Sequence, residues 1–169
     1  MSHPLVIALF DDPNTAAAAA RHLRALGIPP TRVSVVARSH DEEGILARAA
    51  DASPGSEIED SRPASRLAEL SAQLIAAVAL VMPGIGPIVA AGPLAAGLGE
   101  AAGHLAGGVA RSLERAGLSG HDADAWEARV TEGAVLIGAH VPASGVEPAR
   151  ESLTRSGASS VAVCTWPEE

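Results

Sequence analysis

The stretch LSAQLIAAVALVMPGIGPIVAAGPLAAGLG, Leu70–Gly99, constrains how the rest of the chain can fold. It contains no charged residue, and its apolar side chains are mostly alanine, leucine, isoleucine and valine. Residues that interrupt helices stand in its middle, namely Pro83, Gly84, Gly86 and Pro87. Two apolar arms joined by a tight turn are therefore predicted, and we expect residues 66–117 to form an inserted α-helical hairpin.

The apolar surface of such a hairpin needs a cover, because soluble monomers expose apolar patches of roughly a few hundred Å² at most. Membrane lipid, further copies of the chain, or an apolar ligand enclosed between assembled hairpins would each cover it. Glycines recur every four residues on the second arm, a glycine-zipper pattern typical of close helix contact. The residues expected to make the assembly or membrane contact are Leu74, Ile75, Val78, Ile88, Gly99, Gly103 and Gly107.

The residues before the insertion predict a strand, a helix and a second strand. Leu5–Phe10 is a continuous apolar run, typical of a strand buried on both faces. Asp12 is placed to cap a helix over Asn14–Leu26, with Pro13 at its first position and a glycine directly after its end. After a turn that contains two prolines, Arg32–Arg38 is predicted as the second strand, which completes a β-α-β unit.

The C-terminal part repeats this plan. A strand is expected over Ala134–Val141, a short helix over Glu147–Arg155 and a last strand over Ser160–Thr165, and an amphipathic helix over residues 122–132 precedes them. Two β-α-β halves of this size predict an α+β protein with a ferredoxin-like arrangement: one four-stranded antiparallel sheet with two helices on a face.

The predicted domain organisation follows from these elements. Residues 4–38 and 119–166 form the ferredoxin-like domain, and residues 66–117 form the glycine- and alanine-rich hairpin between its halves. Residues 39–65 are polar and are interrupted by proline and glycine, so they are predicted to be a linker.

Composition excludes several classes of function. A net charge of −8 argues against nucleic-acid binding, because phosphate neutralisation requires clustered lysine and arginine. The single cysteine, Cys164, excludes an internal disulfide and a cysteine-rich metal site, and it is expected to be an inert residue of the last strand. We therefore expect a cytoplasmic protein, with the inner face of the cell membrane as the place of any attachment.

No catalytic, cofactor-binding or metal-binding residue is predicted. The six histidines lack ligand spacing within one element, and His104 is expected to form an ordinary helical pair with Glu100. Asp11 and Asp12 follow the first strand, and helix capping accounts for Asp12 without a catalytic role. Gly84-Ile85-Gly86 lacks the remaining residues of a phosphate-binding loop.

The segment VIALFDDPNTAAAAARHLRALGIPPTRVSVVAR, Val6–Arg38, resembles the heat-induced or general-stress-protein domain of bacteria. Related bacterial families carry a glycine-rich apolar segment next, similar to PGIGPIVAAGPLAAGLG, and then a helix and a strand, where this chain has VTEGAVL, Val130–Leu136. The resemblance implies a stress-associated protein, often associated with membranes, and it brings no catalytic residues. The polar linker over residues 39–65 departs from the family pattern.

The expected function is therefore non-enzymatic. The hairpin is predicted to mediate membrane association or homo-oligomeric assembly in a stress-associated protein without cofactors. The alternative is a scaffold or carrier whose assembled hairpins enclose a hydrophobic ligand such as a lipid or quinone.

Overall fold

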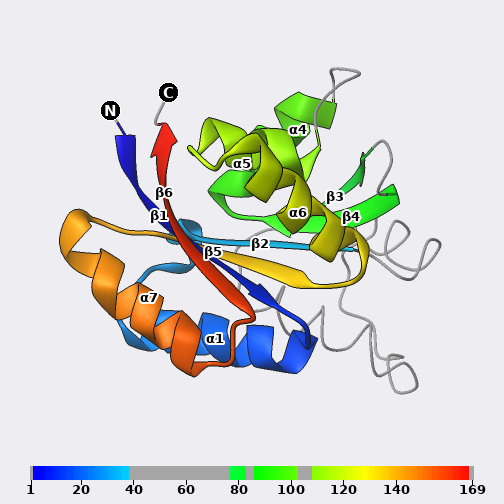
Figure 1. The fold of residues 1–169 in the computed structure, drawn as a ribbon. Helices are drawn as coiled ribbons and strands as arrows, with labels where there is room; N and C mark the ends of the chain where they lie inside the picture. Colours follow the sequence, from blue (N-terminus) through cyan, green and yellow to red (C-terminus); the bar gives the residue numbers. More distant parts are fainter. Residues whose placement is uncertain (1, 39–76, 83–85, 103–107, 168–169) are drawn as a thin grey trace.

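The chain folds into a six-stranded antiparallel sheet with helices on both faces (Figure 1). The computed structural model describes residues 2–38, 77–82, 86–102 and 108–167. The strands are β1 Ser2–Phe10, β2 Val33–Arg38, β3 Ala77–Met82, β4 Gly86–Ala91, β5 Val135–His140 and β6 Ser160–Pro167. The helices are α1 Pro13–Ala25, α4 Pro93–Ala102, α5 Val109–Arg115, α6 Gly120–Thr131 and α7 Val146–Arg155, with the short 3-10 turns η1 Pro30–Arg32 and η2 Ala143–Gly145.

The strand order is β3-β4-β2-β5-β1-β6, and every neighbouring pair is antiparallel. Helices α1 and α7 cover the lower face of the sheet in Figure 1, and α4, α5 and α6 cover the upper face. The α+β class predicted from the sequence is confirmed. The four strands predicted outside the insertion are all present, and they lie side by side in the order β2-β5-β1-β6.

Local signals explain the first half of the fold. The carboxylate of Asp12 accepts a hydrogen bond from the backbone N–H of Asn14 at 2.8 Å, and Pro13 begins α1. The helix ends before Gly27, whose φ of 84° lies in the left-handed region that glycine adopts without strain. The cap, the proline and the terminal glycine thus act as the sequence predicts.

Replacing Asp12 by alanine is expected to lower the free energy of unfolding by about 1 kcal/mol, because the N–H of Asn14 loses its acceptor. Asp12→Asn is the matched control and should remain within a few tenths of a kcal/mol of wild type, since asparagine caps equally well. Urea denaturation of the two variants would measure the difference. Equal losses would contradict the capping role.

Alternation along β1 builds two cores. Its odd-numbered residues from Leu5 to Leu9 point to the upper face, and its even-numbered residues from Val6 to Phe10 point to the lower face. The upper core also contains Val36, Ile88, Leu94, Leu98, Val109, Leu113, Trp126, Val130, Leu136 and Cys164. The lower core also contains Leu23, Val33, Val35, Val135, Ile137, Ala149 and Leu153. A strand buried on both faces is confirmed.

The helical hairpin predicted over residues 66–117 is wrong for part of its described length. Ala77–Met82 and Gly86–Ala91 are the strands β3 and β4, which pair with each other, and β4 also pairs with β2. The described residues of the second arm contain two helices, α4 and α5. The described part of the insertion therefore shares one sheet and one upper core with residues 4–38 and 119–166, whereas the predicted linker over residues 39–65 lies outside the described residues.

Two physical reasons favour strands over helix here. β2 is buried on both faces, so its outer backbone groups need partners, and β4 supplies them along Val35–Arg38. The turn from β4 into α4 also passes very close to β2: a Cβ at Gly92 would lie 2.2 Å from the carbonyl oxygen of Val33. Only glycine fits at this position, where φ is 78°.

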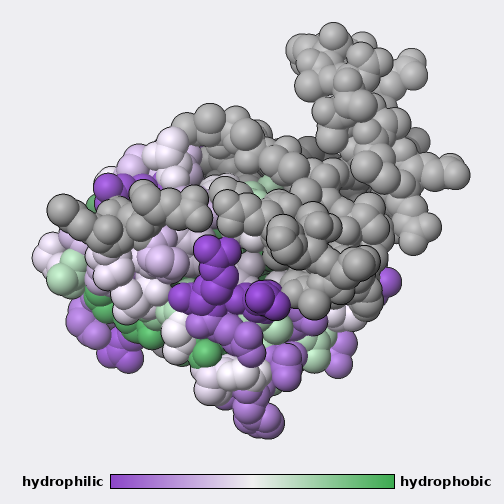
Figure 2. Space-filling view, turned by 90° about the horizontal axis from the view of Figure 1, so that it is seen from above, coloured by the Kyte–Doolittle hydropathy of each residue, from purple (hydrophilic) through white to green (hydrophobic). Residues whose placement is uncertain are grey.

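Among the described residues, the large hydrophobic side chains that remain exposed are Leu26 and Val163, each at 49%. Figure 2 looks onto the molecule from above, and hydrophilic side chains project from the middle of this view while hydrophobic areas are small and separate. Within the described residues, no helix has the length and apolar character needed to cross a bilayer.

Candidate functional site

A buried chain of polar side chains crosses the upper face of the sheet. The Ser34 hydroxyl on β2 lies 3.0 Å from Nε2 of His140 on β5, and Nδ1 of His140 lies 2.8 Å from Nε2 of His3 on β1. At the other end, the backbone N–H of Leu94 in α4 donates to Ser34 Oγ at 3.1 Å. Ser34 is 0% and His140 1% exposed, whereas His3 is half-buried. The chain therefore joins three strands to the first turn of α4.

The surroundings keep the imidazole of His140 neutral. Burial, followed by the nearby His3 and Arg32, lowers the pKa of His140 from its ordinary value of 6.5 to about 3. The ring of Trp166 on β6 meets the His140 ring edge-on, with centroids 5.6 Å apart. Burial beside the Trp166 ring and the positive charge of Arg32 both disfavour the charged form of His140.

The order serine, histidine, histidine resembles a nucleophile, its base and an orienting group, but its geometry favours a structural role. A nucleophilic serine must present its oxygen to a substrate. Ser34 Oγ instead lies under α4, and the N–H of Leu94 already occupies one of its lone pairs. In this arrangement the hydrogen-bonded side chains can hold α4 on the sheet and move a proton between His140 and His3.

Sequence reasoning missed this cluster, because it gave attention to His104, which lies outside the described residues. A signal was present: Ser34 stands between two valines and His140 between Ala139 and Val141, so each is a polar side chain within an apolar run. Buried polar side chains of this kind require partners. The partner of each residue comes from a different strand, so neither pairing follows from local sequence.

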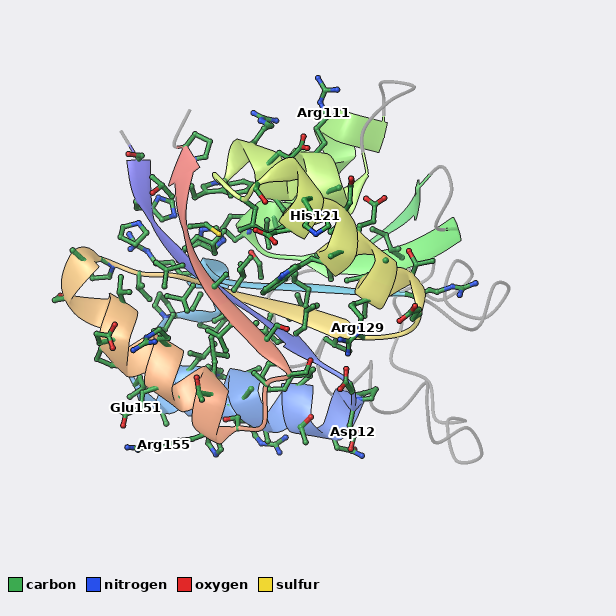
Figure 3. The ribbon with its side chains drawn as sticks, in the orientation of Figure 1. Asp12, Arg111, His121, Arg129, Glu151 and Arg155 are labelled. Carbon is green, nitrogen blue, oxygen red and sulfur yellow. The ribbon has the colours of Figure 1, made fainter. Side chains whose placement is uncertain are left out.

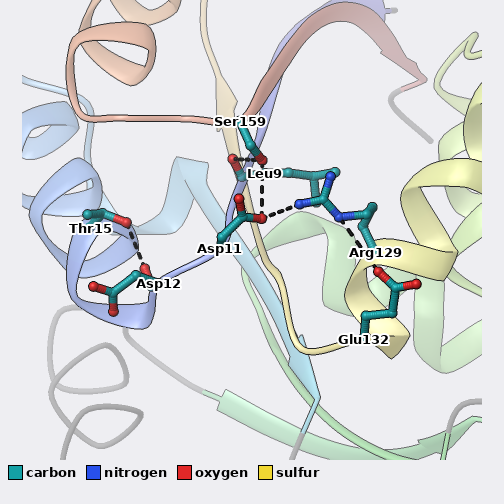
Figure 4. Close-up of polar contacts among 7 residues, drawn as sticks. All are labelled: Leu9, Asp11, Asp12, Thr15, Arg129, Glu132 and Ser159. Atoms are coloured by element: carbon teal, nitrogen blue, oxygen red, sulfur yellow. Dashed lines mark hydrogen bonds and ion pairs between the residues drawn. The ribbon is translucent and has the colours of Figure 1, made fainter.

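A second polar cluster lies on the surface at the end of β1 (Figure 4). The carboxylate of Asp11 pairs with Arg129 of α6 and accepts a weak hydrogen bond from Ser159 at 3.4 Å, and Glu132 lies 3.9 Å from Arg129. Asp12 points away from this group toward α1, whose Thr15 donates to its backbone carbonyl. The Asp11 and Arg129 side chains are 64% and 40% exposed, so their pairing contributes little to stability.

A groove of about 340 Å³ runs between α1 and α7 on the lower side. It is lined by His22, Ala25, Leu26, Pro148, Glu151, Ser152 and Arg155. Glu151 and Arg155 form an ion pair on the outer side of α7, and Arg111 points away from the sheet on the opposite side of the molecule (Figure 3). His22 bridges the two helices through Ser156 at 2.9 Å, so its ring serves helix packing.

One edge of the sheet is formed by β6, whose sequence SVAVCTWP has no charged residue. The backbone N–H of Thr165 points away from β1 and donates to the carbonyl of Ala116 at 2.8 Å, at the end of α5. Because backbone groups alternate in direction along an antiparallel strand, the N–H groups of Val163 and Val161 also point outward. Val163 is the exposed hydrophobic residue in the middle of this edge.

The seven predicted contact residues have different outcomes. Leu74, Ile75, Gly103 and Gly107 lie outside the described residues, while Val78 belongs to β3 and Gly99 to α4. Ile88 is fully buried in the upper core, where it packs within the molecule. The predicted contact by the other residues stays a prediction.

Cys164 is a buried residue of β6, and burial raises the pKa of its thiol to about 11, so the thiolate is scarce at neutral pH. Within the described residues, no three histidine, cysteine or acidic side chains come together in a way that could hold a metal ion. Comparison with family models, curated proteins and solved structures found no match to this chain.

Proposed function

We propose that this chain is a non-enzymatic protein that self-associates, and that two copies meet edge to edge along β6. The observation that supports this proposal is the uncharged, partly open edge of β6, with Val163 49% exposed at its centre. Natural edge strands are usually protected by charges, an internal proline or a bulge. In β6, the one proline is the last residue, Pro167.

The topology supports an association on this side of the sheet. We infer that β2-β5-β1-β6, with α1 and α7 on the lower face, is a ferredoxin-like unit. The insertion adds β4 and β3 beyond β2 and so covers that edge of the unit. The sheet is thereby extended on one side, and β6 remains the terminal strand on the other.

A second copy of the chain is the partner that this edge fits. Antiparallel pairing of β6 with β6 across a two-fold axis gives each N–H and carbonyl of Val161 and Val163 an equivalent partner. Each Val163 side chain would then cover Val161 of the other copy, and no charge on either strand opposes the approach. Thr165 is already bonded to Ala116, which limits the pairing to the first half of the strand.

The test is the molar mass in solution of the wild type and two variants, measured by size-exclusion chromatography with light scattering. Wild-type protein is expected to be a dimer or a multiple of it, and Val163→Lys a monomer, because each lysine would bring charge into the paired edge. Leu26→Lys is the matched control, since Leu26 has the same exposure but lies at the end of α1. It should assemble like the wild type. A monomeric wild type, or equal effects of the two variants, would contradict the proposal.

Membrane association through the apolar insertion, enclosure of a lipid or quinone, and a stress-associated role stay predictions from the sequence. Fractionation without detergent, followed by organic extraction of the soluble protein, separates the first two from edge-to-edge assembly. Protein that sediments with membranes and needs detergent for release would favour membrane association, and an extracted apolar molecule would favour the carrier.

A further inference from the structure

The hydrogen bonds around Ser34 have a direction that follows from counting protons. Leu94 has only an N–H to offer, so Ser34 Oγ accepts from it. We assign the hydroxyl proton of Ser34 to the bond with His140 Nε2, and this direction places the proton of the neutral imidazole on Nδ1. His140 Nδ1–H in turn donates to His3 Nε2. In this arrangement Ser34 Oγ and both ring nitrogens of His140 have partners.

One proton added to the histidine pair reverses the hydrogen bond between His140 and Ser34, whichever histidine carries the charge. If His140 becomes the imidazolium, both its nitrogens donate, Nδ1 to His3 and Nε2 to Ser34. If His3 becomes the imidazolium, its Nε2–H donates to His140 Nδ1, and the proton of neutral His140 must stand on Nε2. The two forms differ only in the position of one proton between the histidines, which are 2.8 Å apart. In both of them, His140 Nε2–H points at Ser34.

The reversal weakens the attachment of α4. Ser34 Oγ must then accept from His140 and from Leu94 at once, and its own proton loses His140 Nε2 as its acceptor. The added positive charge also lies near the N-terminus of α4, where the helix dipole is positive. The N–H of Leu94 belongs to the first turn of the helix and has no acceptor within the helix.

We propose that Ser34, His140 and His3 form a proton-sensitive anchor, in which one proton added to the histidine pair reverses the Ser34–His140 hydrogen bond and loosens the first turn of α4 from the sheet. Loosening would uncover Leu94 and Leu98, which are both 1% exposed in the anchored state. It would also separate Gly97 from the ring of Trp166, which lies within 3.5 Å of where a Cβ on Gly97 would stand.

The groups that act on this pair come from every element packed around it. The titratable or charged groups that act on His140 are His3 on β1 and Arg32 in η1. The neighbouring elements β2, β6 and α4 contribute Ser34, Trp166 and Leu94. The low pKa of His140 agrees with an anchored state that resists the extra proton. The proton-sensitive anchor does not depend on the edge-to-edge assembly proposed for β6.

Amide hydrogen exchange of α4 between pH 7.5 and 5.5, corrected for the intrinsic effect of pH, tests the proposal. In wild-type protein, the protection of the Leu94 amide is expected to fall by up to about tenfold per pH unit, the limit for linkage to one proton. His3→Gln should remove this dependence, because glutamine still accepts from His140 Nδ1–H and takes up no proton. His121→Gln is the control on α6, where His121 is exposed, and should behave as wild type.

Two further measurements keep the test decisive. Ser34→Ala is expected to lower α4 protection at both pH values and to remove the pH dependence, since the acceptor is absent in either state. Imidazole ¹⁵N spectra of the wild type at pH 7.5 should show His140 with its proton on Nδ1. An Nε2–H tautomer at that pH, α4 protection that does not change with pH, or an equal change in His3→Gln would each overturn the proposal.

Discussion

Gly92→Ala is expected to lower the free energy of unfolding by about 3 kcal/mol or more, one of the largest effects of any single methyl group in this chain. The new Cβ would stand 2.2 Å from the carbonyl oxygen of Val33 and 2.8 Å from the Cα of Ser34. Both contacts are with backbone atoms, so no flexible side-chain end can move aside. Relief requires β4 and α4 to move away from β2, which breaks packing in the upper core.

Gly157→Ala separates the two causes of this loss. Gly157 has a φ of 90°, close to the 78° of Gly92, but no atom lies within 4 Å of its added Cβ. This control should cost only about 1 to 2 kcal/mol, the strain of a left-handed backbone for alanine. Denaturant unfolding monitored by circular dichroism would compare the two variants. Equal losses would show that β2 and the turn before α4 do not approach as closely as described.

Wild-type protein is expected to lose stability as the pH falls below about 6.5, because His140 is neutral in the fold. Its pKa is about 3 in the folded protein and 6.5 in an ordinary environment, so between these values the unfolded chain binds the additional proton. The free energy of unfolding therefore rises with pH across this window, and this contribution is fully present above it. The loss between pH 6.5 and 5 should be about 1.5 kcal/mol from this group, since a full pH unit is worth at most about 1.4 kcal/mol.

Urea denaturation at several pH values, in the wild type, His140→Gln and His121→Gln, measures this linkage. His140→Gln is expected to be less stable than wild type at pH 7 and to have a flatter pH dependence, whereas exposed His121 should leave the slope unchanged. NMR titration of the His140 ring in wild-type protein gives the same information if the variant does not fold. A ring that titrates near 6.5, or an unchanged slope in His140→Gln, would contradict the assignment.

The elements outside the insertion could be predicted because their signals are local. Asp12 and Pro13 begin α1 as expected, and the glycine after the helix ends it. The apolar run Leu5–Phe10 supplies both cores through simple alternation. Each of these features depends on a few neighbouring residues, so no knowledge of the rest of the fold is needed.

The insertion could not be predicted in the same way. An alanine- and valine-rich run of this length suits a buried helix or a buried strand, and its periodicity does not distinguish them. Whether Ala77–Met82 and Gly86–Ala91 become strands depends on β2, whose outer backbone groups need partners. β2 lies about fifty residues before β4 in the chain. Ile88 shows the consequence, because a residue predicted to contact a partner is instead packed inside the upper core.

The sequence by itself determined the α+β class, the four strands outside the insertion, the capped helix α1 and the absence of charge along the edge of β6. Tertiary structure alone decided that the apolar insertion continues the sheet, that Gly92 must have no side chain, and that Ser34, His140 and His3 meet. The physical reason is the range of the interactions involved. Caps, turns and alternation act between neighbours, whereas strand pairing and buried hydrogen bonds join residues whose partners only the folded chain brings within 3 Å.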